Sequence, residues 1–249
     1  MINFFRGVRH QMLTESKPIR YMIYASGEIL LVVIGIIIAL MLDDWHDRKI
    51  MEKEKQQYID ALIDDYTLDS TILVRYIDRN KRVESQLSRL NERAYQPFAN
   101  LDTLIAIAHD YIPRYSYINT YHTTTFRTIE STGNFELFDA ELRAPILKHY
   151  QFQNLLIEGQ KVLAQSVTNK VDTYTDNYKI GGMIPEGQHY LLDLSWTIEN
   201  ERTFVVLFTE MIGINRLVIE HFIDDYQDLL VKTEEMLLLL RKAQSDEHS

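Results

Sequence analysis

The sequence contains no cysteine and little glycine or proline, and these shortages narrow the classes of protein it can encode. Without cysteine there is no disulfide, no thiolate nucleophile and no cysteine-ligated zinc or iron–sulfur site. Only 9 glycines and 5 prolines interrupt 249 residues, too few for the many turns of a β-sandwich or barrel. Long helices are therefore expected, and a hydrophobic content of 46% is enough to build a core.

Positive charge is also in short supply. The chain has 36 acidic and 26 basic residues, with a net charge of −10. Since a field of this sign repels phosphates, we expect no nucleic acid among its partners.

A long apolar run lies near the N-terminus, from Tyr21 to Leu42. As a helix it would span roughly 33 Å, which matches the hydrocarbon core of a bilayer. Tyr21 and Tyr24 at one end and Trp45 at the other lie where interfacial aromatic anchors are typical. A cleavable signal peptide is disfavoured because residues 40–43 offer no small-x-small cleavage site. We therefore predict an uncleaved transmembrane helix over residues 21–42 that anchors the chain in the lipid bilayer.

Residues 1–20 precede this helix and carry Arg6 and Arg9 between apolar residues at helical spacing. This pattern indicates either a basic amphipathic helix on an anionic lipid surface or a flexible basic tail. Basic residues are equally numerous on the two flanks, in residues 1–20 and 44–63, but short flanks obey the positive-inside rule better than long domains do. We expect an inner-membrane protein with a cytoplasmic N-terminus and a periplasmic domain.

One face of the predicted transmembrane helix combines an acid with small residues. Its members follow each other at i, i+4, i+7 and i+11: Glu28, Val32, Gly35 and Ala39. Small residues allow close helix approach, and a carboxyl can hydrogen-bond across such a contact. This stripe predicts a homo-oligomer or an interaction with another membrane protein. The alternative is that Glu28 lies near enough to the headgroups to reach water, Arg20 or Tyr24.

Residues 43–244 are predicted to form a helical bundle domain, followed by a flexible tail over 245–249. From Ile59 to Leu90, residues three and four apart form an apolar seam interrupted by Asp69 and Asn80. No glycine or proline interrupts residues 44–94, so one helix is expected to continue from the membrane. A second long seam runs from Phe208 to Leu240, with a helix start near Asn200 and Glu201.

The intervening residues predict shorter helices over Leu101–Tyr111 and Asn119–Thr132, the latter ending at Gly133. Another helix is expected from Asp139 or Pro145 through Tyr174. Residues 179–187, with two glycines and a proline, are typical of a loop. The fold class is therefore all-α: one N-terminal transmembrane helix followed by an elongated helical bundle with long coiled-coil-like helices.

No set of residues in the sequence forms a recognisable catalytic constellation. A Walker-type phosphate loop is missing, and Glu186 and His189 lie in a loop, where a metal chelate is disfavoured. Two clusters of acidic residues are consistent either with a site for a divalent cation or with two solvated helix faces. They are Asp60, Asp64, Asp65 and Asp69, and Asp224, Asp225 and Asp228. A set of aromatic residues is consistent with a pocket, a partner surface or ordinary packing. Its members are Tyr111, Tyr115, Tyr117 and Tyr121, with His109 and His122. We expect no enzyme activity, no cofactor and no metal.

Several stretches resemble an uncharacterised bacterial family of single-pass inner-membrane proteins with a helical soluble domain. The resemblance is carried by residues 1–9, the Tyr24–Leu40 span, Asp44-Trp45 and four central stretches: Thr125-Phe126, Ser131-Thr132-Gly133-Asn134, Leu142-Arg143 and His149-Tyr150. Relatives often have asparagines where this chain has Asp43-Asp44. The resemblance implies inner-membrane placement and makes Glu28 part of the anchor pattern, but it implies no substrate.

These observations favour a membrane-anchored, non-enzymatic interaction or scaffold protein that presents its helical domain outside the cytoplasm. The alternative is a sensor or ion-coupled regulatory component that uses Glu28 within the membrane.

Overall fold

The computed structural model describes residues 18–97, 99–178 and 200–246. It is 88% helical, and no strand occurs among the described residues, so the all-α prediction is confirmed. The predicted segment 1–20 falls almost entirely outside the described residues, as do the loop at 179–187 and the pair Glu186 and His189.

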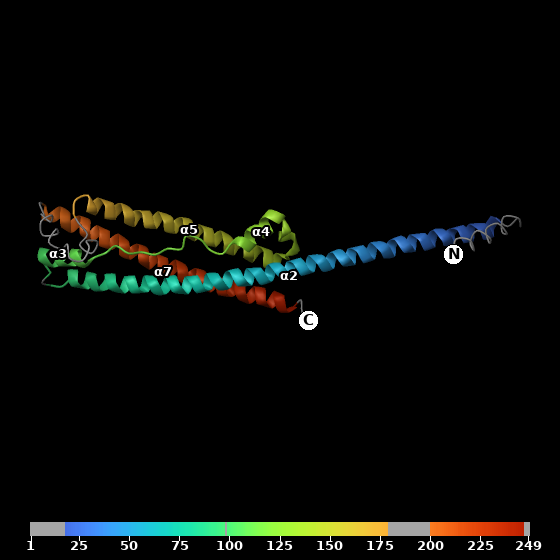
Figure 1. Cartoon of the computed structure of the whole chain (residues 1–249), viewed down its shortest axis with the longest axis horizontal. Helices are drawn as coiled ribbons and strands as arrows, with labels where there is room; N and C mark the ends of the chain where they lie inside the picture. Colours follow the sequence, from blue (N-terminus) through green and yellow to red (C-terminus); the bar gives the residue numbers. More distant parts are fainter. Residues whose placement is uncertain (1–17, 98, 179–199, 247–249) are drawn as a thin grey trace, which may run out of the picture. The chain divides into compact units, whose positions relative to one another are not determined.

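The first described helix, α2, is unbroken from Pro18 to Ala94 (Figure 1). The prediction that one helix continues from the apolar segment through residues 44–94 is therefore confirmed, and no helix breaker occurs in this stretch. The chain divides into two compact units at Gln56–Gln57, within this helix. The described part of the first unit consists of α2 alone.

In the described residues of the second unit, the last part of α2 is followed by five elements. These are α3 (Leu101–Asp110), α4 (Thr124–Thr132), the single turn η1 (Asn134–Leu137), α5 (Ala140–Thr175) and α7 (Glu201–Asp246). Asn100 caps α3 through a reciprocal capping box with Thr103. Gly133 ends α4 at φ 77°, a conformation that glycine adopts without strain, as expected for a C-terminal cap. Asn200 accepts a hydrogen bond from the backbone N of Thr203, which confirms the predicted start of α7.

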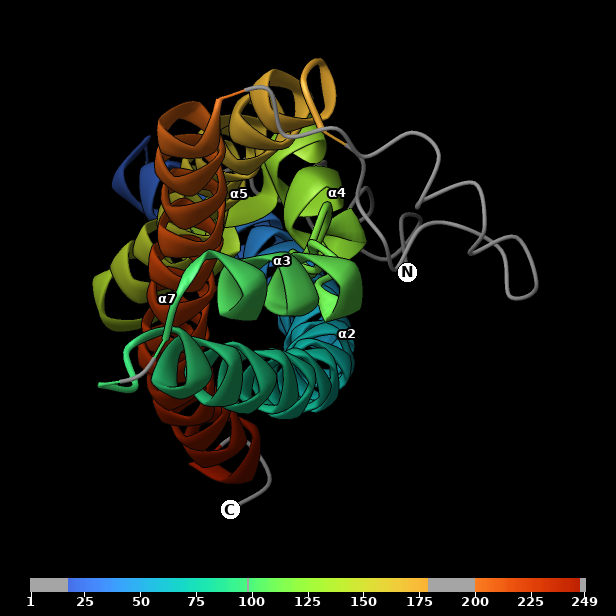
Figure 2. The ribbon, with the colours of Figure 1, turned by 90° about the vertical axis from the view of Figure 1, so that its left-hand side faces the viewer.

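Three hydrophobic clusters hold this unit together, and each takes side chains from α2, α5 and α7. One joins Leu62, Ile146 and Leu240, and another joins Leu73, Val167 and Phe222. The third joins Leu87, Tyr174 and Phe208 with Ile107 of α3, which lies close to the C-terminal end of α2 (Figure 2). Apolar burial along the facing sides of the three long helices is thus what stabilises the unit.

The ten seam positions predicted between Phe208 and Leu240 are all buried in α7. Asp69 and Asn80, the polar positions of the first seam, are also fully buried. The three-four spacing therefore identified the inner faces of both helices correctly.

One predicted helix start is wrong. Residues 119–123 are not helical, and α4 begins only at Thr124. Side chains of neighbouring helices accept hydrogen bonds from backbone N–H groups of the extended segment 111–123, which joins α3 to α4 in Figure 1. Of the two starts left open for the next helix, Asp139 is confirmed, because it caps α5 by accepting from the backbone N of Leu142. Pro145 therefore lies inside the helix.

Candidate functional site

One described helix is long and apolar enough to cross a membrane, and it begins with the predicted anchor. None of its most apolar stretch is buried against the rest of the chain. Every residue from Ser26 to Lys53 is exposed. Exposing so many large apolar side chains to water would be strongly unfavourable, so this part of α2 requires lipid or another protein around it.

The four stripe residues lie on one face of this helix: Glu28, Val32, Gly35 and Ala39. All four are exposed, and a Cβ added at Gly35 would meet nothing within 4 Å. The stripe is therefore open to a second helix. Glu28 forms no hydrogen bond with any described residue.

The predicted interfacial anchors flank the apolar run. Tyr24 and Trp45 are both exposed, whereas the side chain of Tyr21 lies outside the described part of the chain. The Lys49 ammonium lies 4.2 Å from the centre of the Trp45 ring. An aromatic ring next to a cation suits the headgroup region of a bilayer.

In the second unit the side chain of Asp69 is fully buried and accepts three hydrogen bonds. Its Oδ1 accepts from the backbone N of His122 at 2.9 Å and from Nδ1 of the same residue at 2.8 Å. Its Oδ2 accepts from Nε2 of Gln153 at 2.8 Å. Asp69 thus ties α2 to the extended segment and to α5. The predicted polar seam residue acts as a structural tie within the chain.

Burial raises the pKa of Asp69, although the hydrogen bonds from His122 and Gln153 lower it in part. Burial next to this carboxyl also raises the pKa of Tyr66. The carboxylate is surrounded by donors of the protein itself and is closed to solvent, so no substrate atom can reach it. The contacts of this side chain give it a structural role between α2, the extended segment and α5.

Similar ties hold the rest of the extended segment. The Tyr226 hydroxyl accepts from the backbone N of Ile118 at 2.9 Å and donates to Oε1 of Gln160 at 3.0 Å. Nδ2 of Asn80 donates to the carbonyl of Ser116 at 2.9 Å. The segment lacks helical hydrogen bonds of its own, and polar side chains of α2 and α7 replace some of them.

The predicted aromatic group contributes mainly to packing. Tyr111 and Tyr121 are buried, and Tyr111 accepts a hydrogen bond from Asn215 at 2.7 Å. Tyr115 and Tyr117 stack with ring centres 6.4 Å apart. Of the three interpretations left open by the sequence, ordinary packing is the one this geometry supports.

Sequence reasoning missed the polar inner face of α5. His149, Gln153 and Gln160 are buried there, at the same three-four spacing as their apolar neighbours. The apolar pattern of this helix predicts Leu156, Val167 and Tyr174 correctly as buried, whereas Leu147, Tyr150 and Leu163 of the same pattern are only partly buried. Helical spacing that also admits histidine and glutamine would have identified the correct face.

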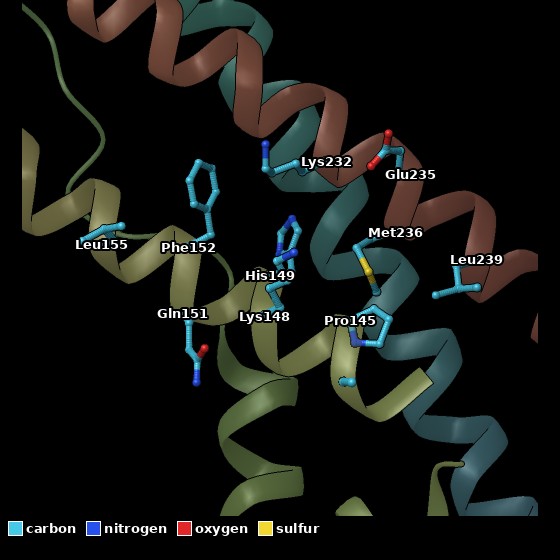
Figure 3. Close-up of a pocket in the computed structure, with 11 residues that line it drawn as sticks. Pro145, Lys148, His149, Gln151, Phe152, Leu155, Lys232, Glu235, Met236 and Leu239 are labelled. Atoms are coloured by element: carbon cyan, nitrogen blue, oxygen red, sulfur yellow. The ribbon is translucent and has the colours of Figure 1, made fainter. Parts of the chain in front are cut away.

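Next to this face, a groove of about 720 Å³ opens between α5 and α7 (Figure 3). Phe152 and Leu155 line it from α5, and Met236 and Leu239 line it from α7. His149 also lines the groove, although only 4% of its surface is exposed. This volume lies within the range of about 300–1,000 Å³ that is typical of small-molecule sites.

The hydrogen bonds around His149 determine which of its ring nitrogens carries the proton. The Thr233 hydroxyl lies 2.8 Å from the carbonyl oxygen of Leu229 and donates its one hydrogen there. Since Nε2 of His149 lies 3.0 Å from that same hydroxyl, Nε2 is the donor. Nδ1 then carries only a lone pair, and it has no hydrogen-bond partner among the described residues. Burial lowers the pKa of His149 to about 4, so the ring is neutral at pH 7.

Neither acidic cluster gathers into a cation site. Within residues 18–97, 99–178 and 200–246, no group of three histidine or carboxylate side chains is arranged to hold a metal ion. Asp69 points into the core, whereas Asp64 and Asp224 are exposed. The interpretation as solvated helix faces therefore holds for Asp64 and Asp224 and is wrong for Asp69.

Comparisons of the whole chain with protein-family models, curated proteins and solved structures found no match. The resemblance noted in the sequence therefore remains a prediction, and the functional argument rests on the chain's own geometry.

Proposed function

We propose that this chain is a membrane-anchored, non-enzymatic interaction protein, oligomeric through its membrane helix. The observation that carries this proposal is the wholly exposed apolar stretch of α2, which is unpartnered within the chain. In this proposal, residues 21–42 span the inner membrane with the N-terminus in the cytoplasm. The unit that starts at Gln57 is a helical bundle with coiled-coil-like packing, and it binds its partner in the periplasm.

The non-enzymatic part of the proposal is supported by the hydrogen bonds of three buried ionisable groups. Asp69 is engaged by three donors, and the buried tyrosines Tyr111 and Tyr226 are hydrogen-bonded to other side chains. A general base requires access to a substrate proton, and Asp69 has no such access.

The experiment that tests the oligomer uses the absence of native cysteine. A Val32→Cys variant carries a single thiol on the stripe, so disulfide formation in native membranes reports a helix pair. We expect crosslinked dimers that disappear when Gly35→Leu is added, because the leucine side chain separates the two backbones. Gly27→Leu is the matched control, since Gly27 is equally open but lies on another face. Equal crosslinking in both leucine variants would contradict the packing proposal.

A separate experiment tests on which side of the membrane the second unit lies. Tyr95 is 77% exposed at the far end of α2, so Tyr95→Cys gives an accessible thiol in the second unit. We expect a membrane-impermeant maleimide to label it in intact spheroplasts. Labelling only after lysis would place the unit in the cytoplasm. Affinity purification from crosslinked membranes would then identify the partner.

A second candidate function is a sensor or ion-coupled component. The observation that favours it is the carboxyl of Glu28, an ionisable group on the stripe that has no partner in the described chain. The two functions differ in whether Glu28 must titrate, which a Glu28→Gln variant addresses.

A further inference from the structure

We propose that a groove lined by arginines, formed by the last part of α2 and the residues that follow α3, binds an extended acidic segment of a partner protein. This proposal rests on the interaction function proposed above, and it assigns that function to one surface of the second unit.

Two hollows that share Gln86 and Arg89 make up this arginine groove. The first has a volume of about 480 Å³ and lies between α2 and the residues after α3, where Arg114 lines it. The second has a volume of about 540 Å³ and is lined by α2 alone. From Asp78 to Arg93 the lining follows α2 for roughly 22 Å. An extended segment of about seven residues has this length.

The lining of the arginine groove is basic, in a chain whose net charge is −10. Arg82, Arg89 and Arg93 follow each other at i, i+7 and i+11, which places them on one face of α2. Five bases line the two hollows: Lys81, Arg82, Arg89, Arg93 and Arg114. The lining contains two acids, Asp78 and Asp110. Positive charge therefore remains in excess when all the charged residues of the lining are included.

Four of the five bases have no carboxylate partner among the described residues. Arg93 is the exception, because its Nη1 lies 3.3 Å from Oδ2 of Asp110. Arg82, Arg89 and Arg114 are exposed, and none of them forms an ion pair within residues 18–97, 99–178 and 200–246. Like charges that line one groove repel each other, and an anionic ligand would remove this repulsion.

The geometry of the groove favours the carboxylates of a peptide as the ligand. A guanidinium group can donate two parallel hydrogen bonds to a carboxylate, and Arg93 already binds the carboxylate of Asp110. Arg82 and Arg93 are roughly 16 Å apart along α2, which fits several carboxylates on one chain better than a single compact anion. Leu87 and Leu90 add apolar side chains to the lining, and side chains that exclude water strengthen ion pairs next to them.

The test uses the full chain reconstituted in phosphatidylcholine nanodiscs, whose lipid has no net charge. The probe is fluorescein-labelled octaglutamate, and its uncharged counterpart is octaglutamine with the same label. Fluorescence anisotropy measures the Kd of each peptide. We expect octaglutamate to bind and octaglutamine not to bind, and the affinity for octaglutamate to fall as the salt concentration rises.

Variants with altered charge locate the binding site. Arg89→Gln with Arg114→Gln removes two exposed cations of the groove and should raise the Kd for octaglutamate about five- to tenfold. Arg127→Gln with Arg241→Gln makes the same change in net charge at exposed arginines outside the groove and should leave the Kd unchanged. Gln86→Arg adds a cation where the two hollows meet and should lower the Kd, a gain that misfolding cannot produce.

Equal losses of affinity in the two double variants would show that octaglutamate responds only to overall charge, and would overturn the proposal. Displacement of octaglutamate by inorganic phosphate or by phosphatidylglycerol vesicles, at the same concentration of negative charge, would also overturn it. The groove would then belong to a small anion or to a lipid surface. Crosslinking of Val32→Cys does not involve the groove, so a loss of peptide binding with crosslinking intact would refute this proposal alone.

Discussion

Two carboxyl groups of α2, those of Asp69 and Glu28, lie in opposite environments. Asp69 is completely buried and receives three hydrogen bonds from side chain and backbone groups of its own chain. Glu28 lies on an exposed apolar face and receives none from the described residues. A buried charge needs partners, and the fold supplies them for Asp69. For Glu28 the partner must be a headgroup, water or a second helix. The Asp69 carboxyl therefore holds segments of the chain together, whereas the Glu28 carboxyl is open to a partner outside the described chain.

The largest effect on stability is expected when the Asp69 carboxyl is removed. Asp69→Ala leaves Nε2 of Gln153 and the backbone N of His122 without an acceptor, and each unsatisfied donor should lower the free energy of unfolding by about 1–3 kcal/mol. Chemical denaturation followed by circular dichroism measures the loss. Asp64→Ala, an exposed carboxylate on the same helix, should change stability by less than about 0.5 kcal/mol. Equal effects of the two variants would contradict the assigned role of Asp69.

Lowering the pH should reduce the free energy of unfolding of the same unit, because His149 takes up a proton on unfolding. Its pKa is lowered to about 4 in the folded chain and returns to 6.5 on unfolding, so the unfolded chain binds the proton first. This contribution to stability is complete above pH 6.5 and is lost as the pH falls towards 4, to a total of about 3 kcal/mol. The raised pKa of Asp69 acts in the opposite direction and offsets part of the loss at low pH.

The difference between the wild type and His149→Asn isolates the histidine contribution. We expect the stability of the variant to depend less on pH between 6.5 and 4, as measured by denaturation at each pH. Parallel curves for both proteins would show that His149 is not the responsible group.

A single hydroxyl should have a smaller effect. Tyr226→Phe removes the acceptor for the backbone N of Ile118 and the donor to Gln160, so a loss of about 1–3 kcal/mol is expected. Hydrogen exchange at Ile118 should accelerate as well, because its amide is left without a partner. Tyr95→Phe, at an exposed tyrosine, is the control and should be neutral.

The smallest effect is expected at Glu28. Glu28→Gln keeps the shape and a hydrogen-bonding group, so the strength of the helix pair should change by only about 0.6 kcal/mol. Energy transfer between labelled chains in vesicles measures it. A much larger loss, or a loss of cellular function with the helix pair intact, would favour the sensor over the scaffold.

The predictions from the sequence were accurate where a helix has one continuous pattern. The long helix α2, the inner face of α7 and the caps at Gly133 and Asn200 all followed from spacing and local hydrogen-bonding preferences. They failed at residues 119–123 and at the buried polar positions of α5. In both places polar side chains distant in the sequence provide the hydrogen bonds, and apolar periodicity carries no information about such partners.

The sequence by itself determined that the chain is helical, that one apolar stretch can cross a membrane and that Glu28 shares a face with Gly35 and Ala39. These properties depend on composition and on the 3.6-residue period of a single helix. Only the tertiary structure decided that Asp69 is hydrogen-bonded by His122 and Gln153, and that His149 lines a groove between α5 and α7. Those properties depend on side chains from separate helices meeting at hydrogen-bonding distance, which no local pattern encodes.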